Sequence, residues 1–339
     1  MMNHRERVMA AIRGEPVDRV PVSFWLHNHA QENTAQALAA ETVRLHHTFG
    51  WDFLKPQSRA LCFAEMWGQQ LEYSGQRTVA PAISRFALRD ARELGSLQPA
   101  DARTGALAEQ LQALRAIRAA VGADVPIVAT LFAPLMVATY MTPGRRDEIL
   151  RLMREEPAKL DHGLAAICET LTQYARDCID AGVDGIFYAT TVATQPLISE
   201  AECKRFQRQY DQAIFKAVQS APFNIMHVCG DHTRFEEFVD YPVSVFSWAT
   251  TPGNPALTQA RKLTGRAVLG GLPGKPQISG MQPEALVERA RASIAETGGR
   301  GHLLGPDCSI NPGTPDALLH AVNEALAVKP AQGTARSNG

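Results

Sequence analysis

Two residues with the side chains of soft metal ligands lie two positions apart at the end of a short apolar run. His227 and Cys229 are separated only by Val228. In an extended strand, residues i and i+2 point to the same face, so the imidazole and the thiol can reach one ion. A third such residue, Cys308, stands far downstream in the segment Gly-Pro-Asp-Cys-Ser. Two thiolates and an imidazole suit zinc, and three protein ligands leave a position open for water or substrate, as in catalytic zinc sites.

The same residues also allow a purely structural interpretation, because free cysteine is often buried as a small hydrophobic residue. A lone His-x-Cys pair is a weak pattern by itself. The neighbouring residues favour the metal site. A glycine follows the His-x-Cys pair, and Cys308 is surrounded by glycine and proline residues. Such residues mark strand ends that open into loops, where barrel enzymes keep their chemistry. We therefore predict that the three residues bind a catalytic zinc ion.

Further candidates for substrate binding stand at the ends of other predicted strands. The His-x-His pair after the first strand could itself bind a metal, although substrate contact or plain loop polarity is the more common role. Aromatic residues at strand ends more often shape a pocket than perform chemistry. The aspartate beside Cys308 either orients a metal ligand or caps the turn that follows. These candidates are His27, His29, Tyr188, Trp248 and Asp307.

Short β-branched runs alternate with amphipathic helical patterns, which is typical of a parallel sheet built from crossover units. We count eight such runs, and eight parallel strands close a (β/α)8 TIM barrel, an α/β fold whose catalytic groups lie at the carboxyl ends of the strands. His227 would end strand 5 and Cys308 would follow strand 8, so Cys308 must reach across the mouth. The expected strands span residues 20–26, 51–55, 126–131, 186–188, 224–228, 243–248, 267–271 and 301–304.

Other segments complete the prediction. Residues 3–13 form an N-terminal amphipathic helix, and residues 62–83 alternate and turn like a hairpin excursion after strand 2. Residues 1–329 are expected to form a single barrel domain, and the tail at 330–339, rich in Ala, Gly, Ser and Asn, is expected to be disordered. The remaining helices are expected at 35–48, 101–121, 157–181, 199–220, 256–263, 283–297 and 314–327, with a short one from 233 and two segments broken at Pro143-Gly144.

The composition is that of a soluble globular enzyme, with 45% hydrophobic and 20% charged residues among 339. The 34 basic and 35 acidic residues give a net charge of −1. A chain with this net charge has no strong positive electrostatic field to attract nucleic acid or an anionic membrane. Since neither a signal-peptide core nor an apolar run of about 18 residues is present, we expect a cytoplasmic location. The six cysteines show no disulfide spacing, and Cys168, Cys178 and Cys203 are expected to be packing residues.

Five stretches of the chain resemble the uroporphyrinogen decarboxylase superfamily, and within it the zinc-dependent methyltransferases that move a methyl group from a methylcorrinoid protein to a thiol such as coenzyme M. The resemblance covers nearly the whole chain. It implies a TIM barrel, zinc on His227, Cys229 and Cys308, a corrinoid such as methylcobalamin, and a small-molecule thiol or related methyl acceptor. The stretches are RERVMAAIRGEPVDRVPV at 5–22, DAGVDGI at 180–186, HVCG at 227–230, LGGL at 269–272 and GPDCSINPGTP at 305–315.

Two departures from the family patterns bear on the substrate. The decarboxylases carry an Arg-Gln-Ala-Gly-Arg segment after strand 1 that clamps the propionates of a tetrapyrrole, whereas residues 24–29 here read FWLHNH. The absence of arginine argues against uroporphyrinogen as substrate. The coenzyme M enzymes do not share this sequence at residues 24–29 either. The sequence therefore does not identify the methyl donor or the acceptor.

Three functions are therefore compared. The first is a zinc-dependent, corrinoid-using methyltransferase. Because Asp231-His232 lacks the Asp-x-His-x-x-Gly spacing of a corrinoid-binding domain, any corrinoid must arrive on a partner protein or as a free cofactor. The alternative is a decarboxylase of a carboxylic acid other than uroporphyrinogen, and the third is a barrel that binds a corrinoid or thiol without turnover. The sequence is compatible with a homodimer but does not determine the oligomeric state.

Overall fold

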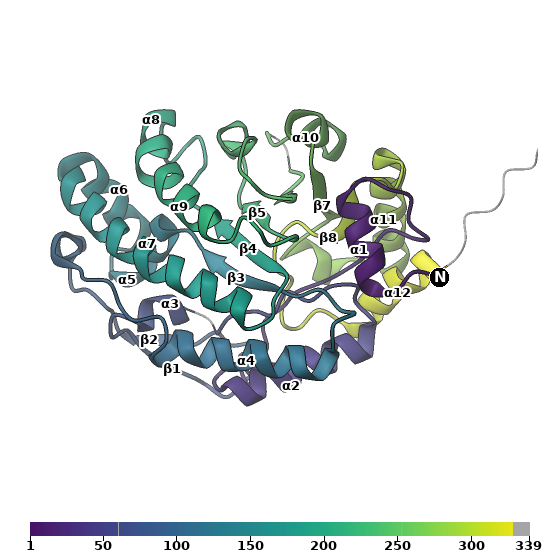
Figure 1. Cartoon of the computed structure of the whole chain (residues 1–339), viewed down its shortest axis with the longest axis horizontal. Coiled ribbons are helices and arrows are strands. Elements are labelled where there is room, and N and C mark those ends of the chain that lie inside the picture. The colour runs from purple at the N-terminus through teal and green to yellow at the C-terminus, as the bar shows by residue number, and fades with distance from the viewer. Residues whose placement is uncertain (60, 252, 328–339) are drawn as a thin grey trace, which may run out of the picture.

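The centre of the molecule is a parallel sheet of six strands (Figure 1), in a computed structural model that describes residues 1–59, 61–251 and 253–327. The strands follow one another in chain order. A segment with at least one α-helix joins each neighbouring pair except β5 and β6, which are joined by a segment with a 3-10 turn. Nearly every strand residue is buried, as strands covered by helices on their outer side must be. The strands are β3 (Val128–Phe132), β4 (Gly185–Thr190), β5 (Ile225–Val228), β6 (Val245–Trp248), β7 (Ala267–Leu272) and β8 (His302–Pro306).

Two short extended segments close this sheet into a barrel. Val22 forms a parallel bridge with Leu304 of β8, and Leu54 forms one with Ile127, which lies next to β3. The amide of Asp52 donates to the carbonyl oxygen of Val22 over 2.8 Å, which joins the two segments. The predicted TIM barrel is confirmed, with one correction. The first two predicted strands contribute isolated bridges, because prolines in and beside them lack the amides that longer ladders need.

Helices surround the barrel on its outer side (Figure 1), and their ends follow local rules. For example, the second helix begins after Thr34, whose side chain accepts from the amide of Ala37, and ends at Gly50, whose φ of 62° suits glycine. The helices are α1 (His4–Ile12), α2 (Ala35–Phe49), α3 (Cys62–Glu65), α4 (Gly105–Val121), α5 (Pro134–Met141), α6 (Arg145–Glu155), α7 (Pro157–Asp180), α8 (Glu200–Cys203), α9 (Gln209–Ala217), α10 (Leu257–Thr264), α11 (Pro283–Thr297) and α12 (Asp316–Ala327).

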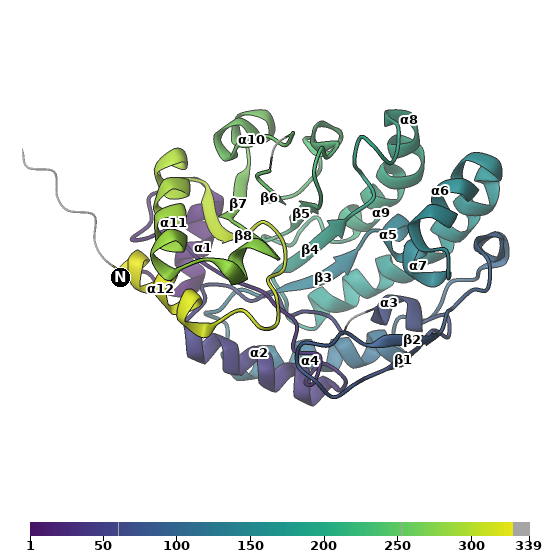
Figure 2. The ribbon, with the colours of Figure 1, turned by 180° about the vertical axis from the view of Figure 1, so that it is seen from behind.

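The predicted excursion after the second barrel segment is an antiparallel hairpin of β1 (Gln70–Glu72) and β2 (Ala82–Arg85). It lies on the side of the molecule that carries α3 and α4 (Figure 2). The predicted tail at 330–339 lies outside the described residues. Among the helices of the described ranges, none combines the length and the apolar character that crossing a membrane requires.

The helix predicted at 199–220 is interrupted. A π-helical segment, Lys204–Arg208, separates α8 from α9, and its wider turn carries Gln207 into the interior. There the Gln207 amide donates to Asp211 over 2.7 Å and accepts from Thr190 over 3.0 Å. The short helix predicted from 233 is a single 3-10 turn. The 3-10 turns are Ala91–Ser96, Phe235–Phe238 and Gln277–Gly280.

The inside of the barrel is filled from alternate strand positions. Ile225 packs there with Val245, and Val8 of α1 belongs to the same cluster, so α1 closes the end of the barrel where the strands begin. Because side chains alternate along a strand, His227 faces inward like Ile225, whereas Val228 packs in the outer core between strands and helices. The carboxyl end of β5 therefore presents its imidazole to the mouth of the barrel.

Candidate metal centre

The end of β5 and the loop after β8 bring His227, Cys229 and Cys308 together. The two sulfur atoms lie 3.7 Å apart, and one ligand atom from each of the three side chains lies within 4.8 Å of the others. Zinc–sulfur bonds of about 2.3 Å in a tetrahedron place two sulfurs about 3.8 Å apart. The donor atoms and their spacing therefore fit a zinc ion.

Backbone geometry at two glycines lets the loops approach this closely. The amide of Cys229 donates to the carbonyl oxygen of Thr190 over 2.9 Å, and the chain then turns at Gly230, whose φ of 114° is easily adopted only by glycine. In the loop after β7, a Cβ atom on Gly274 would lie 3.1 Å from the amide nitrogen of Cys308. The missing side chain at 274 thus leaves room for the cysteine.

The imidazole of His227 is held in one orientation. Its Nδ1 lies 3.0 Å from the hydroxyl of Ser247, its register partner on β6, and its ring packs 5.1 Å from the ring of Phe187. This contact engages Nδ1 and leaves Nε2 for a metal, as in most histidine metal ligands. His227 is buried, whereas Cys229 and Cys308 are half-buried. An ion on this set would therefore face solvent on the side of the thiols.

The two thiols share a proton. Cys229 donates to the sulfur of Cys308, and this contact lowers the pKa of the Cys308 thiol well below its ordinary value while burial opposes the fall. Hydrogen bonding and the charge of His227 lower it further. The same shared proton, with burial, raises the pKa of Cys229. The contact thus favours the thiolate form of Cys308, which is the form that binds metal.

Lys55 is a residue of this site that the sequence did not single out. It ends the second extended segment, donates to Gln57, and places its ammonium 4.9 Å from the ring of Phe187 and 5.9 Å from that of Trp25. Burial lowers its pKa to about 7, and the charge of Cys308 opposes the fall. Its sequence signal was a lysine directly after an apolar strand pattern. A cation here can attract an anionic group or a thiolate.

Asp307 supports the loop that carries Cys308. Its carboxylate accepts from the hydroxyl of Thr250 over 3.3 Å, and Arg289 donates to the same hydroxyl over 3.3 Å. Burial raises the pKa of Asp307 to about 6, and the Thr250 and Arg289 contacts oppose the rise. These bonds tie the loop after β8 to the end of β6 and to α11.

His27 and His29 lie at the same end of the barrel. Leu26 bridges Ile310, two residues beyond Cys308, so the His-x-His loop runs beside the cysteine loop. Nδ1 of His27 lies 2.8 Å from the carboxylate of Glu32, a residue that the sequence did not indicate. The predicted histidines are therefore neighbours of the metal centre.

Tyr188 and Trp248 do not join the metal ligands, which corrects their predicted place at the mouth. Both are fully buried in the outer core, on the strand faces that point toward the helices. Tyr188 donates to Asp211 on α9, and the indole of Trp248 donates to the carbonyl oxygen of Pro255 over 2.9 Å. The prediction used their position at strand ends but not the alternation of faces.

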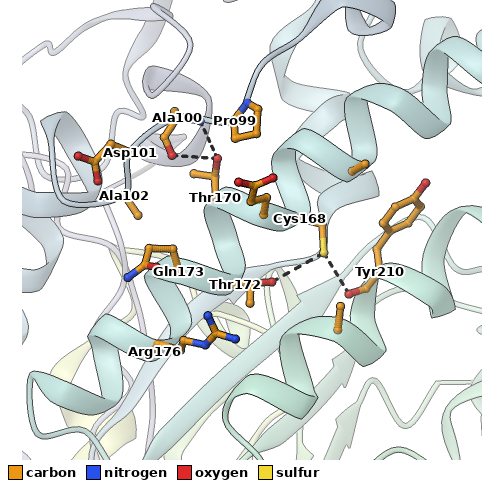
Figure 3. A pocket seen from close by; sticks show the side chains of 13 residues that line it. Pro99, Ala100, Asp101, Ala102, Cys168, Thr170, Thr172, Gln173, Arg176 and Tyr210 are labelled. Carbon is orange, nitrogen blue, oxygen red and sulfur yellow. Dashed lines mark hydrogen bonds between the residues drawn. The ribbon is translucent and has the colours of Figure 1, made fainter.

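A groove of about 680 Å³ lies away from this centre, on the outer face of α7 and α9 (Figure 3). Its Cys168 contacts the hydroxyl of Thr172 and the carbonyl oxygen of Tyr210. Burial raises the pKa of the Cys168 thiol to about 11. Burial thus disfavours the reactive thiolate form of Cys168. Its burial, like that of Cys178 and Cys203, agrees with the packing role predicted for these cysteines.

Comparison with known proteins gives two kinds of relative. The methylcobamide:CoM methyltransferase MtaA of Methanosarcina barkeri is 25% identical over 346 residues, covering 95% of this chain and 98% of that protein. A uroporphyrinogen decarboxylase of Anaeromyxobacter sp. is 26% identical over 358 residues, covering 96% and 98%. Among solved structures, a methyltransferase from Methanosarcina mazei superposes with a TM-score of 0.81 at 21% identity, covering 96% and 98%, which shows the same fold.

The profile of one protein family spans nearly the whole chain. The family is described as uroporphyrinogen decarboxylase (URO-D), and its profile matches residues 3–327. The predicted superfamily is thereby confirmed, as is the prediction that the chain is an enzyme. On its sequence, its barrel and the length of this match, the chain belongs to the uroporphyrinogen decarboxylase family.

Proposed function

We propose that this chain is a zinc-dependent methyltransferase that moves a methyl group from a corrinoid, supplied in trans, to a thiol or related acceptor. One observation carries the proposal. Two cysteine sulfurs 3.7 Å apart converge with a histidine at the carboxyl end of the barrel. A ligand set of this kind suits zinc and leaves one position for a substrate.

The relatives support the methyltransferase branch of the family. Proteins named as methylcobamide:CoM methyltransferases match the chain over 94% to 95% of its length. Uroporphyrinogen decarboxylases also match. Against a uroporphyrinogen substrate, the loop after the first barrel segment presents His27 and His29 where those enzymes carry arginines. We therefore place the chain with the methyltransferases and keep decarboxylation of another acid as the alternative.

The residues of the centre have separate tasks in this proposal. His227, Cys229 and Cys308 would hold the metal, and zinc there would bind the acceptor sulfur as a thiolate that stays nucleophilic. Ser247 fixes the imidazole through Nδ1. Lys55, whose pKa of about 7 leaves its amine partly protonated at neutral pH, would place positive charge near Cys308 and so favour an anionic acceptor at the mouth. The buried rings of Trp25 and Phe187 pack beside the amine of Lys55 and would give it an apolar surrounding.

The methyl donor must come from outside the chain. The sequence has no Asp-x-His-x-x-Gly segment, so a corrinoid protein or free methylcobalamin would present the methyl group at the mouth. We keep the oligomeric state, including a homodimer, as a separate question. The location that we propose is the cytoplasm.

The test supplies the purified chain with methylcobalamin and 2-mercaptoethanesulfonate and measures both the methyl thioether and the demethylated corrinoid. We expect about one zinc per chain at the thiolate centre, and loss of that metal and of turnover in Cys229→Ser and Cys308→Ser. Cys168→Ser is the matched control, because its thiol lies in the outer groove and its loss leaves the centre intact.

Two results would overturn the proposal. One is full metal content and turnover in both cysteine variants of the centre. The other is release of carbon dioxide from a carboxylic acid, without a methyl acceptor and with no effect of chelators, which would establish the decarboxylase alternative. A series of thiols, with and without an anionic group, then identifies the acceptor class.

A further inference from the structure

Two stacked histidines and a carboxylate form a second cluster in the loop after the first barrel segment. The rings of His27 and His29 lie 4.8 Å apart, with 16° between their planes. Both turn Nδ1 toward the same oxygen of Glu32, at 2.8 Å from His27 and 3.5 Å from His29. One ligand atom from each of the three residues lies within 4.8 Å of the others.

The cluster is buried and incompletely paired. Glu32 is 2% exposed and His29 is 7% exposed. The carboxylate accepts from His27 and from the amide of Asn28. Nδ1 of His29 has no hydrogen-bond partner among the described residues, since 3.5 Å to Glu32 exceeds the limit of about 3.2 Å for a well-formed bond. A buried nitrogen directed at a carboxylate without bonding to it is costly unless something lies between them.

The spacing fits a metal ion between these atoms. Nitrogen and oxygen ligands about 2.1 Å from one ion are separated by about 3.0 Å at a right angle and about 3.4 Å at a tetrahedral angle. The observed separations of 2.8 and 3.5 Å lie close to these two values. We infer that His27, His29 and Glu32 form a second metal site, which takes a divalent transition-metal ion and is chemically distinct from the thiolate centre.

The donor set defines the class of ion. Two imidazoles and one carboxylate suit zinc, iron(II), cobalt(II), nickel(II) or manganese(II), and they leave positions for water or an anionic ligand. His27, whose side chain is 24% exposed, marks the side from which an ion enters. The amide of Asn28 and the carbonyl oxygen of Arg77 hold the loop, because the first donates to Glu32 and the second accepts from the amide of His29.

The second site lies beside the first. Leu26 bridges Ile310, so the loop that begins at His27 runs next to the loop of Cys308. Burial lowers the pKa of Lys55, and the charges of Cys308 and Glu32 both oppose that fall, so the ammonium lies within electrostatic reach of both clusters. Binding of the second ion does not rest on the proposed methyl transfer, and it can be measured without any substrate.

The experiment loads the full chain with cobalt(II), removes unbound metal, and measures cobalt per chain together with the absorption spectrum. We expect two cobalt ions per chain, of which only one gives thiolate-to-cobalt charge-transfer absorption. His29→Ala and Glu32→Gln should each hold one ion and keep the charge-transfer band. His27→Ala is a third variant at a more exposed position, in case burial makes the other two unstable. The matched control is His47→Ala, an exposed histidine on α2, which should keep both ions.

Each outcome is decisive for one of the two sites. A single cobalt in the unchanged chain, with the same content in all three cluster variants, would overturn the second site and leave a His27–Glu32 hydrogen-bonded pair. Cobalt at the cluster without a charge-transfer band would support the second site and count against the thiolate centre on which the proposed function rests. The Cys229→Ser variant separates the two further, because it should abolish the band and keep one ion.

Discussion

The orientation of one imidazole decides whether the three predicted ligands can meet on an ion. His227 is buried against Phe187, and the hydroxyl of Ser247 engages its Nδ1 at 3.0 Å. Rotation of the ring would move Nε2 away from the two sulfurs and break this bond inside the barrel, where a lost partner is costly. Ser247 thus acts through His227, as a positioning residue.

We predict that Ser247→Ala weakens zinc binding by about 10- to 100-fold, as loss of a partner behind a metal-binding histidine commonly does. The hydroxyl is removed without a change of fold, so the effect should fall on affinity. Competition with a chromophoric chelator measures it. Ser244→Ala is the control, because the hydroxyl of Ser244 donates to the backbone carbonyl oxygen of Asn224 and, among the described residues, to no other group. Equal zinc affinity in both variants would show that Ser247 does not position the histidine.

Some residues of the centre could be predicted from the sequence, and others could not. The spacing of His227 and Cys229 on a strand places both side chains on one face. Cys308 was predicted from its residue type and its glycine and proline neighbours, and the family resemblance implied the same residue. Ser247 meets His227 only through the register of two strands, which no local pattern encodes. Glu32 reaches His27 through a folded loop. Tyr188 and Trp248 were assigned to the mouth by position along their strands, while the alternation of faces turns them outward.

At the scale of elements, the loop after β7 packs directly against the residue that supplies the second thiol. An ideal Cβ on Gly274 would lie 3.1 Å from the amide nitrogen and 3.6 Å from the Cβ of Cys308. Contact with backbone cannot be relieved by turning a side chain. Any atom added at 274 must therefore displace one of the two loops.

We predict that Gly274→Ala weakens metal binding by about tenfold, at the lower end of what changes around the ligands cost, because the sulfur of Cys308 moves relative to that of Cys229. The global free energy of unfolding should change by less than about 1 kcal/mol, since the three atoms nearest to the new Cβ all belong to Cys308 in the neighbouring loop. Metal affinity and urea unfolding measure the two effects. Gly280→Ala is the control, since its Cβ would meet nothing within 4 Å. Unchanged affinity in Gly274→Ala would contradict the close fit.

The helices and the later strands were predictable because each has a regular repeat of apolar residues and residues that mark where it begins and ends. The first two barrel strands were harder, since each forms isolated bridges instead of a continuous ladder and side chains supply part of the contact between them. Ser23, for example, donates to the carbonyl oxygen of Phe53 over 2.7 Å. The interruption of the helix at 204–208 was also missed. Its cause is the buried bond between Gln207 and Asp211, which only the folded chain creates.

At the scale of the molecule, one buried carboxylate joins α1 to both closing segments of the barrel. Asp52 is fully buried and accepts from Arg7 over 2.7 Å, from Arg19, and from the amide of Val22 over 2.8 Å. His4 of α1 lies 3.0 Å from it. The junction of α1 with the two closing segments of the barrel therefore centres on one buried carboxylate.

We predict that Asp52→Asn lowers the free energy of unfolding by about 3 kcal/mol, because removing one partner leaves buried arginine charge uncompensated. Asp18 still pairs with Arg7, which limits the loss. Burial alone would raise the pKa of Asp52, but hydrogen bonds from His4 and Arg19 and the charge of Arg19 hold it below its ordinary 3.8. Urea unfolding at neutral pH measures the change.

The lowered pKa also fixes the sign of the pH dependence. A carboxyl group that is more acidic in the folded state stabilises the fold above the unfolded pKa near 3.8, and this contribution is lost as pH falls through the folded value. The difference between the unchanged chain and Asp52→Asn should therefore shrink as the pH is lowered below about 4. Glu15→Gln is the control, because it removes an exposed partner of Arg13. At each pH, its urea midpoint should equal that of the unchanged chain. If the difference in free energy of unfolding between Asp52→Asn and the unchanged chain stays constant from pH 7 into the acid range, the residue stabilises the barrel through its packing and not through its charge.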